Sequence, residues 1–274
     1  VVIDEAAQAL EPATWIPISR ASKVILAGDP FQLPPTVKSF EAKNKGLGTT
    51  LLEKCVKQFP EVSFLNVQYR MNQLIMNFSN SQFYDNQLVA HESVANWELP
   101  KGDVSPVIFI DTAGAGFNEE ANTETLSKYN SGEYFILREH FLQFVNTLAE
   151  HDLEMPTVGI ITPYRSQILH MKEQFMEDET LTAYQEFVTI NTIDGFQGQE
   201  RDVIYISLVR SNDKNEIGFL NDYRRMNVAM TRARKQLVII GDSATIGQDE
   251  FYGKFIEYVE KCGGYRSAWE FMGG

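Results

Sequence analysis

Short apolar runs alternate along this chain with longer amphipathic stretches, and this alternation restricts the possible fold more than any other feature. The runs, rich in β-branched residues, lie at residues 1–4, 23–28, 64–67, 107–111, 158–162, 188–191, 203–209 and 236–241. Apolar residues at three- and four-residue spacing predict helices at residues 49–59, 72–84, 133–150, 164–177, 222–232 and 249–262. Nearly apolar strands separated by helices predict an α/β fold, with a parallel sheet covered by helices on both faces.

The length and composition are those of a folded protein with one large domain or two smaller ones. The chain has 274 residues, of which 43% are hydrophobic and 22% charged. Its apolar runs are far shorter than the ~20 residues that span a bilayer, and no signal-peptide pattern is present. Cys55 and Cys262 lack metal-ligand spacing, which predicts thiols in an intracellular compartment, either cytoplasm or nucleus. Because a core-type strand begins at residue 1 without a Met, we expect the chain to be part of a longer one.

The charge is acidic overall but basic in one segment. The net charge of −13 argues against wholesale binding to phosphate backbones, which depends on Lys and Arg. Eight of the 24 Lys and Arg residues nevertheless fall within residues 201–235. This segment is therefore expected to meet an anionic partner or ligand. Residues 113–131, rich in Gly, Asn and Glu, are expected to form an exposed, mobile loop.

Parallel sheets bind ligands at loops beyond the carboxyl ends of their strands, and two such loops carry polar side chains early in the chain. Asp4 and Glu5 follow the first strand, where one carboxylate could hold Mg²⁺ and the other could activate water. A helix cap with a solvated neighbour is the alternative. Gln32 lies in a loop stiffened by Gly and Pro, and its amide could sense a terminal phosphate or simply cap a turn.

Three further segments have both a functional and a structural interpretation. Tyr69 and Arg70 follow the third strand, where they could stack on a base and grip phosphate, or pack at the boundary and pair with an acid. Residues 192–200 form a Gly-containing loop whose backbone could approach a ligand closely. The Arg-rich stretch 222–234 could serve a ligand or merely match the dipole at a helix end.

Taken together and in order, these segments resemble the motor core of superfamily 1 helicases. The matching blocks are VVIDEAAQ, LAGDPFQLPP, VQYRMN, NTIDGFQGQERD and NVAMTRAR. The 5′-to-3′ branch, with the nonsense-mediated-decay and immunoglobulin-mu-binding-protein helicases, is the most similar. The resemblance implies a RecA-like P-loop NTPase fold in which two domains clamp ATP. Residues 1–66 would end the first domain, and residues 67–274 would form the second.

The resemblance also implies roles for residues at the matching positions. For the nucleotide it implies a Mg²⁺ ligand at Asp4, a water-activating carboxylate at Glu5, a γ-phosphate sensor at Gln32, an adenine-stacking ring at Tyr69, arginine fingers at Arg70 and Arg232, close backbone at Gly198 and a ribose contact at Glu200. For a single strand of RNA or DNA it implies contacts at Pro163, Tyr164 and Thr192.

One motif of the family is missing from these residues. The phosphate-binding loop G-x-x-x-x-G-K-[ST] occurs nowhere in the sequence, and the resemblance places it upstream. We therefore expect an ATP-dependent 5′-to-3′ helicase or translocase whose present portion does not hydrolyse ATP alone. A non-catalytic module that binds nucleic acid or protein is the alternative. A metabolic nucleotide-binding enzyme would leave the arginines of the last three blocks without a purpose.

Overall fold

The computed structural model describes residues 1–59, 62–103 and 105–273, which form two compact units. The first unit is Val1–Leu65 and the second is Asn66–Gly274. Each unit is described by itself. Within the described ranges, no helix combines the length and apolarity needed to cross a membrane.

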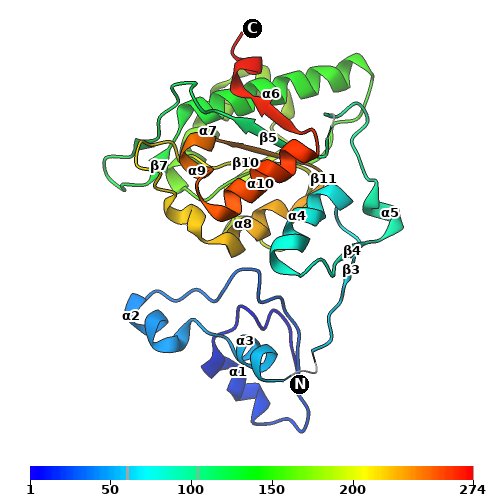
Figure 1. The fold of residues 1–274 in the computed structure, drawn as a ribbon, viewed down its shortest axis with the longest axis vertical. Coiled ribbons are helices and arrows are strands. Elements are labelled where there is room, and N and C mark those ends of the chain that lie inside the picture. Colours follow the sequence, from blue (N-terminus) through cyan, green and yellow to red (C-terminus); the bar gives the residue numbers. More distant parts are fainter. Residues whose placement is uncertain (60–61, 104, 274) are drawn as a thin grey trace. The chain divides into compact units, whose positions relative to one another are not determined.

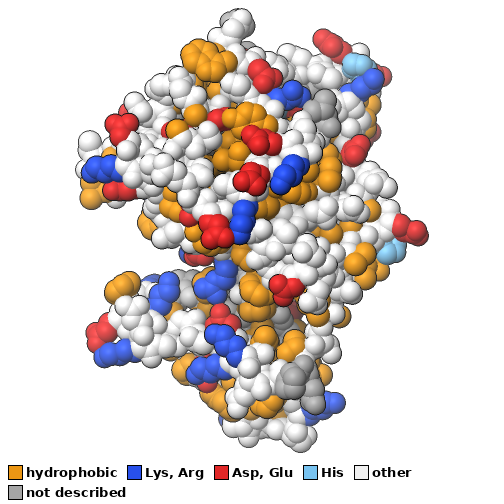
Figure 2. Space-filling view, viewed as in Figure 1, with side chains coloured by type: hydrophobic (Ala, Val, Ile, Leu, Met, Phe, Trp, Pro, Cys, Tyr) orange, Lys and Arg blue, Asp and Glu red, His pale blue; other side chains and the backbone are white. Residues whose placement is uncertain are grey.

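The first unit is small and has little core of its own. Its elements are the parallel pair β1 (Val2–Ile3) and β2 (Ile25–Leu26), with the helices α1 (Glu11–Ile18), α2 (Phe40–Ala42) and α3 (Leu51–Gln58). Helix α3 begins at a capping box, in which Thr50 and Glu53 bond each other's backbone N–H groups. Among its described residues, Ala6, Ala7 and Leu52 form a small buried apolar cluster, against which the half-buried Ile3 and Leu26 pack. Hydrophobic side chains therefore reach the surface among the charged ones (Figure 2).

The second unit is built on a six-stranded parallel sheet. In order across the sheet its strands are β12 (Tyr265–Ser267), β5 (Val107–Asp111), β11 (Ala233–Gly241), β10 (Arg201–Ser207), β8 (Val158–Thr162) and β9 (Val188–Thr192). Residues of β5 and β8 are buried throughout, as apolar runs covered on both sides must be.

Helices cover both faces of this sheet (Figure 1). On one face, α6 (Ser131–Glu150) and α7 (Arg165–Glu177) pack their apolar stripes against the strands, with Phe141 of α6 touching Tyr205 of β10. The other face is covered by α4 (Gln73–Phe83), α8 (Tyr223–Met230) and α10 (Glu250–Lys261), with Phe255 of α10 edge-on to Phe109 of β5. The predicted parallel sheet with helices on both faces is confirmed.

The remaining elements are short. They are the parallel pair β3 (Val67–Gln68) and β4 (Val89–Ala90), the hairpin of β6 (Glu120–Ala121) and β7 (Lys128–Tyr129), the helices α5 (Glu92–Ala95) and α9 (Ser243–Ile246), and short helical turns at Lys43–Leu47, Glu179–Tyr184, Asp194–Phe196, Gly218–Asn221 and Ala268–Phe271.

Several expected elements differ from those observed. Residues 113–131 were expected to be an exposed, mobile loop; they are largely exposed, but they contain the β6–β7 hairpin, which is held by an ion pair between Glu119 and Arg210. The expected strand 64–67 is replaced by β3, and the edge strand β12 was not anticipated because Tyr265, Arg266 and Ser267 form no apolar run. Local pattern carries no signal for pairing with distant residues.

A buried polar network closes the carboxyl end of β10. The Glu133 side chain is completely buried, and its Oε2 accepts from the Ser207 hydroxyl (2.6 Å) and the Val209 N–H (2.9 Å). Val209 has a φ of 71°, a left-handed conformation that costs a β-branched residue about 1–3 kcal/mol. The Asn130 side chain also donates to the Val209 carbonyl (3.3 Å). These bonds hold the chain where it leaves the sheet.

Burial raises the pKa of Glu133 from 4.5 to about 8, despite the bonds from Ser207 and Val209. Between about pH 4.5 and about pH 8, Glu133 keeps its proton in the folded state and releases it in the unfolded state. The free energy of unfolding therefore falls as pH rises through this window. Glu133→Gln, which resembles the neutral acid, is expected to remove this loss, on the order of 1 kcal/mol per pH unit within the window. Urea unfolding of both proteins from about pH 5 to about pH 9 measures the difference; a difference independent of pH would contradict the assignment.

Candidate nucleotide site

The acidic pair of the first unit follows β1 and faces solvent. Asp4 and Glu5 are both exposed, and the Asp4 carboxylate accepts from the Glu5 N–H (2.9 Å). Glu5 has a φ of 51°, and its carboxylate accepts from the Gln8 amide (2.8 Å). Helix α1 begins only at Glu11, so the pair does not cap it as the structural alternative supposed. Carboxylate oxygens remain accessible for a cation and for water.

The loop after β2 lies directly beside this pair. The Ala6 N–H donates to the Ala27 carbonyl (2.8 Å), and a Cβ at Gly28 would lie 2.9 Å from the Ala7 nitrogen. Only glycine permits this approach. The Gln32 side-chain amide donates to Asp29 Oδ2 (2.9 Å). The other oxygen of this carboxylate, Asp29 Oδ1, accepts from the Phe31 N–H in the same turn. Asp29 thus orients Gln32. The residues Gly28, Asp29 and Pro30 are typical of a turn, but they do not by themselves predict this pairing.

In the second unit, Arg70 and Glu200 meet across 130 positions of sequence. Arg70 Nε donates to Glu200 Oε2 (2.7 Å), and Arg70 Nη1 donates to the Thr231 carbonyl (3.4 Å). The turn that presents Arg70 is held by the Gln68 amide oxygen, which accepts from the Arg70 N–H (2.8 Å). The end of β3, the loop before β10 and the end of α8 therefore converge on one place.

Arg232 lies in the same cluster but not on a helix. The expected helix 222–232 ends at Met230, because the backbone turns there to enter β11 at Ala233. Arg232 is only 3% exposed; its Nε donates to the Val228 carbonyl (3.0 Å) and its Nη1 to that of Gln199 (3.4 Å). The guanidinium is consequently pre-oriented by backbone oxygens.

Glu200 is flanked by a second arginine, Arg234, to which the family resemblance assigns no role. Arg234 Nε lies 3.7 Å from Glu200 Oε1, and its guanidinium lies over the Trp97 ring at 4.4 Å. Arg234 lies in the arginine-rich stretch 222–234, which is a candidate ligand-binding segment, whereas no sequence pattern indicates a role for Trp97. The cluster thus holds one carboxylate between Arg70 and Arg234.

Two further candidates, Tyr69 and Gly198, are exposed to solvent. The Tyr69 side chain is exposed, and its ring is stacked with that of His91. Gly198 has a φ of 73°, and a Cβ there would meet nothing within 4 Å. The left-handed conformation requires glycine and leaves its backbone open to a ligand.

The candidate contacts for a nucleic-acid strand lie at the carboxyl ends of two strands. Pro163 and Tyr164 follow β8, and Thr192 is the last residue of β9. Pro163 and Thr192 are half-buried, and the Thr192 hydroxyl accepts from the Gly195 N–H (3.3 Å). Tyr164 is only 3% exposed, and its ring packs on Phe219 with centroids 5.5 Å apart. Tyr164 therefore offers little ring surface to solvent.

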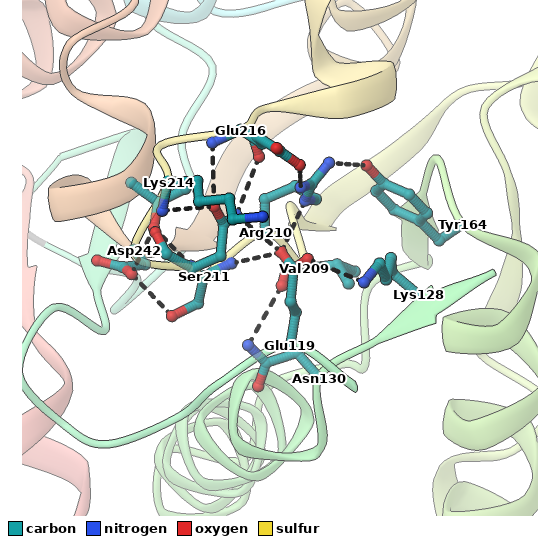
Figure 3. A network of polar contacts seen from close by, with 12 residues as sticks. Glu119, Lys128, Asn130, Tyr164, Val209, Arg210, Ser211, Lys214, Glu216 and Asp242 are labelled. Atoms are coloured by element: carbon teal, nitrogen blue, oxygen red, sulfur yellow. Dashed lines mark hydrogen bonds and ion pairs between the residues drawn. The ribbon is translucent and has the colours of Figure 1, made fainter. Parts of the chain in front are cut away.

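Tyr164 belongs to a network of buried charge (Figure 3). Arg210 Nε donates to Glu119 Oε2 (2.7 Å), and Arg210 Nη1 donates to the Tyr164 hydroxyl (3.5 Å). Burial raises the pKa of Glu119, but hydrogen bonds from Arg210, Asn212 and Lys128 outweigh it and hold the pKa below its usual value. This pairing ties the β6–β7 hairpin to the segment after β10.

Comparison with known proteins identifies the family. Two family models, each described as an AAA domain, match residues 47–244 and residues 1–40. The first match alone covers more than half of the chain. The chain belongs to the superfamily 1 helicases. Its helix-covered parallel sheet is the RecA-like fold of that family.

Relatives of this helicase family align with nearly the whole chain. It is 42% identical to the DNA polymerase alpha-associated DNA helicase A of Saccharomyces cerevisiae, over 98% of this chain and 40% of that protein. It is 37% identical to DNA-binding protein SMUBP-2 of Mesocricetus auratus, over 99% of this chain and 28% of that protein. It is 39% identical to an uncharacterized ATP-dependent helicase of Methanocaldococcus jannaschii, over 95% of this chain and 38% of that protein. The chain spans about two fifths or less of the length of these relatives.

Proposed function

We propose that this chain is the part of an ATP-dependent helicase or translocase that supplies its hydrolytic groups and its arginine fingers. Residues 1–66 would complete a first RecA-like domain, and residues 67–274 would form the second. The observation that supports this most is the convergence of Arg70, Glu200 and Arg232 from three separate segments. The guanidinium groups of the half-buried Arg70 and the buried Arg232 are both held by backbone carbonyls, and such groups are suited to stabilising charge on a transferring phosphoryl group.

The first unit would provide the metal ligand and the base. Mg²⁺ is usually bound through one or two carboxylates, with substrate phosphates and water completing its shell, and the exposed Asp4 fits that pattern. When bound, Mg²⁺ would neutralise phosphate charge. Within the described residues, no group of three or more His, Cys, Asp and Glu side chains is arranged to hold a metal ion. Glu5 would orient and deprotonate the attacking water, and Gln32, aligned by Asp29, would sense the γ-phosphate.

In the second unit, a bound nucleotide would replace one partner of the ion pair between Arg70 and Glu200. Arg70 is engaged by Glu200 at 2.7 Å, so binding of the γ-phosphate would replace this carboxylate as the partner of Arg70. Glu200, still beside Arg234, would then be available to accept from ribose hydroxyls. Tyr69 would stack on adenine, and the open backbone at Gly198 would approach the nucleotide.

The substrate would be a single strand of RNA or DNA, on which the protein moves 5′ to 3′. Pro163 and Thr192 would lie along the strand's path, and the buried Tyr164 would support this surface rather than stack on a base. The names of two of the relatives refer to DNA, but backbone contacts and stacking are possible with both polymers. A module that only binds nucleic acid or protein is the second candidate, and it is favoured if the longer protein lacks a phosphate-binding loop.

The proposal expects a longer protein that contains this chain, and ATP hydrolysis by such a protein tests it. We expect hydrolysis stimulated by single-stranded RNA, DNA or both, and none from residues 1–274 alone, which lack the G-x-x-x-x-G-K-[ST] loop. A coupled phosphate-release assay on both proteins, with each polymer and without, distinguishes the outcomes. Turnover by residues 1–274 alone would contradict the proposal, and an inactive longer protein that still binds strands would support the binding module.

A further inference from the structure

One face of the Tyr69 ring is already occupied by another side chain. Tyr69 is 64% exposed, yet its ring stacks on that of His91, with centroids 4.4 Å apart and planes inclined at 30°. Parallel stacking at this distance is a favourable aromatic contact. The exposure of Tyr69 and the one-sided contact leave ring surface available to a third planar group.

His91 is itself fixed by three bonds of different origin. Its N–H donates to the Gln68 carbonyl (2.9 Å), which extends the pairing of β3 with β4. Its Nδ1 accepts from the Ser93 N–H (3.3 Å) and lies 2.9 Å from the Ser93 hydroxyl, so the imidazole caps α5. A ring held by backbone pairing and by a helix cap has little rotational freedom. It therefore forms a rigid support rather than a casual surface contact.

His91, which supports the Tyr69 ring, and Arg70, the candidate phosphate-binding residue, are linked through Gln68. Gln68 accepts from His91 through its carbonyl and from Arg70 through its side-chain oxygen (2.8 Å). Tyr69 lies between them in sequence. The orientation of its ring is therefore coupled on one side to His91 and on the other to the turn that presents Arg70.

We propose that His91 is a positioning residue for nucleobase binding, the inner layer of a stack in which the base lies on the outer face of Tyr69. This inference rests on the proposed function, because it requires that the site bind a nucleoside triphosphate. Without His91, the Tyr69 side chain would sample several rotamers, and the base would lose part of a pre-oriented platform. The link from His91 to Gln68 runs through the backbone N–H, which an alanine at position 91 keeps, so the turn that presents Arg70 and the phosphate contacts should be unchanged.

Substitutions in the longer protein test this inference by separating base from phosphate. His91→Ala is expected to raise the KM for ATP roughly three- to tenfold, the size of one aromatic stacking contact, with kcat nearly unchanged. Inhibition by tripolyphosphate, which has no base, is expected to stay the same. His91→Phe is expected to recover most of the affinity, because a phenyl ring restores stacking although it cannot cap α5. His151→Ala, at an exposed helix end, is the control and should change nothing.

A double-mutant cycle then distinguishes a positioning role from a general loss of structure. Tyr69→Ala should weaken ATP binding by itself, and His91→Ala added to it should have little further effect, since the ring it supports is gone. Equal loss of ATP and tripolyphosphate binding, or no recovery with His91→Phe, would overturn the inference. If Tyr69→Ala weakens ATP binding and His91→Ala does not, the inference alone fails; if the unaltered protein binds no ATP, the proposed function fails.

Discussion

Arg232→Ala in the longer protein is expected to lower the rate of ATP hydrolysis by about 10³–10⁵-fold, the usual contribution of an arginine finger. The reason is electrostatic: the guanidinium offsets charge that develops on the phosphoryl oxygens only in the transition state. The kcat of strand-stimulated hydrolysis measures the effect. Binding to the strand should persist.

Because Arg232 is 3% exposed and donates to the Val228 and Gln199 carbonyls, the alanine variant also loses buried hydrogen bonds. That loss costs about 1–3 kcal/mol of stability, so its melting temperature must be measured as well. Arg232→Lys keeps the positive charge but not the planar fork, and should remain strongly impaired. Arg138→Ala, which removes the ion pair between Arg138 on α6 and Asp178 at the end of α7, is the matched control and should hydrolyse ATP normally. Near-normal turnover by a folded Arg232 variant would refute the assignment.

Glu5→Gln in the same protein is expected to reduce hydrolysis by about 10²–10⁴-fold, since an amide cannot take a proton from the attacking water. The substitution preserves size, and the new amide oxygen can still accept from Gln8, so the fold should be unaffected. Nucleotide affinity, measured by displacement of a fluorescent ADP analogue, should be nearly unchanged.

Glu41→Gln provides the comparison for Glu5→Gln. This exposed carboxylate of the same unit pairs only with Lys45 among the described contacts, so its loss should leave hydrolysis intact. A large fall in the nucleotide affinity of Glu5→Gln would indicate that Glu5 contributes to binding rather than to the chemical step. Equal losses from both variants would show that overall charge, not a specific base, matters.

The sheet of the second unit could be predicted from sequence because its central strands are buried on both faces. The apolar runs at 107–111 and 158–162 coincide with β5 (Val107–Asp111) and β8 (Val158–Thr162). The run at 203–209 extends past β10, which ends at Ser207, because Val209 adopts a left-handed turn held by Glu133. An apolar pattern reports burial, and it cannot distinguish a strand from a strained apolar turn.

The identities of the candidate site residues were likewise readable in sequence, and their roles stay predictions. Their partners were not readable. Arg70 with Glu200, Arg210 with Glu119 and Tyr69 with His91 are each separated by many positions in the chain. Which residues meet is decided by the order of the strands across the sheet and by where each loop leaves it.

By itself, the sequence determined the alternation of strands and helices, the family and the set of polar side chains at strand ends. These depend on local periodicity and local turn chemistry. Only the tertiary structure decided that Arg232 is buried against backbone carbonyls, that Glu200 lies between Arg70 and Arg234, and that His91 supports Tyr69. The physical reason is that burial and charge pairing are properties of segments brought together through space, as Arg232 meets the Gln199 carbonyl, and local periodicity does not report them.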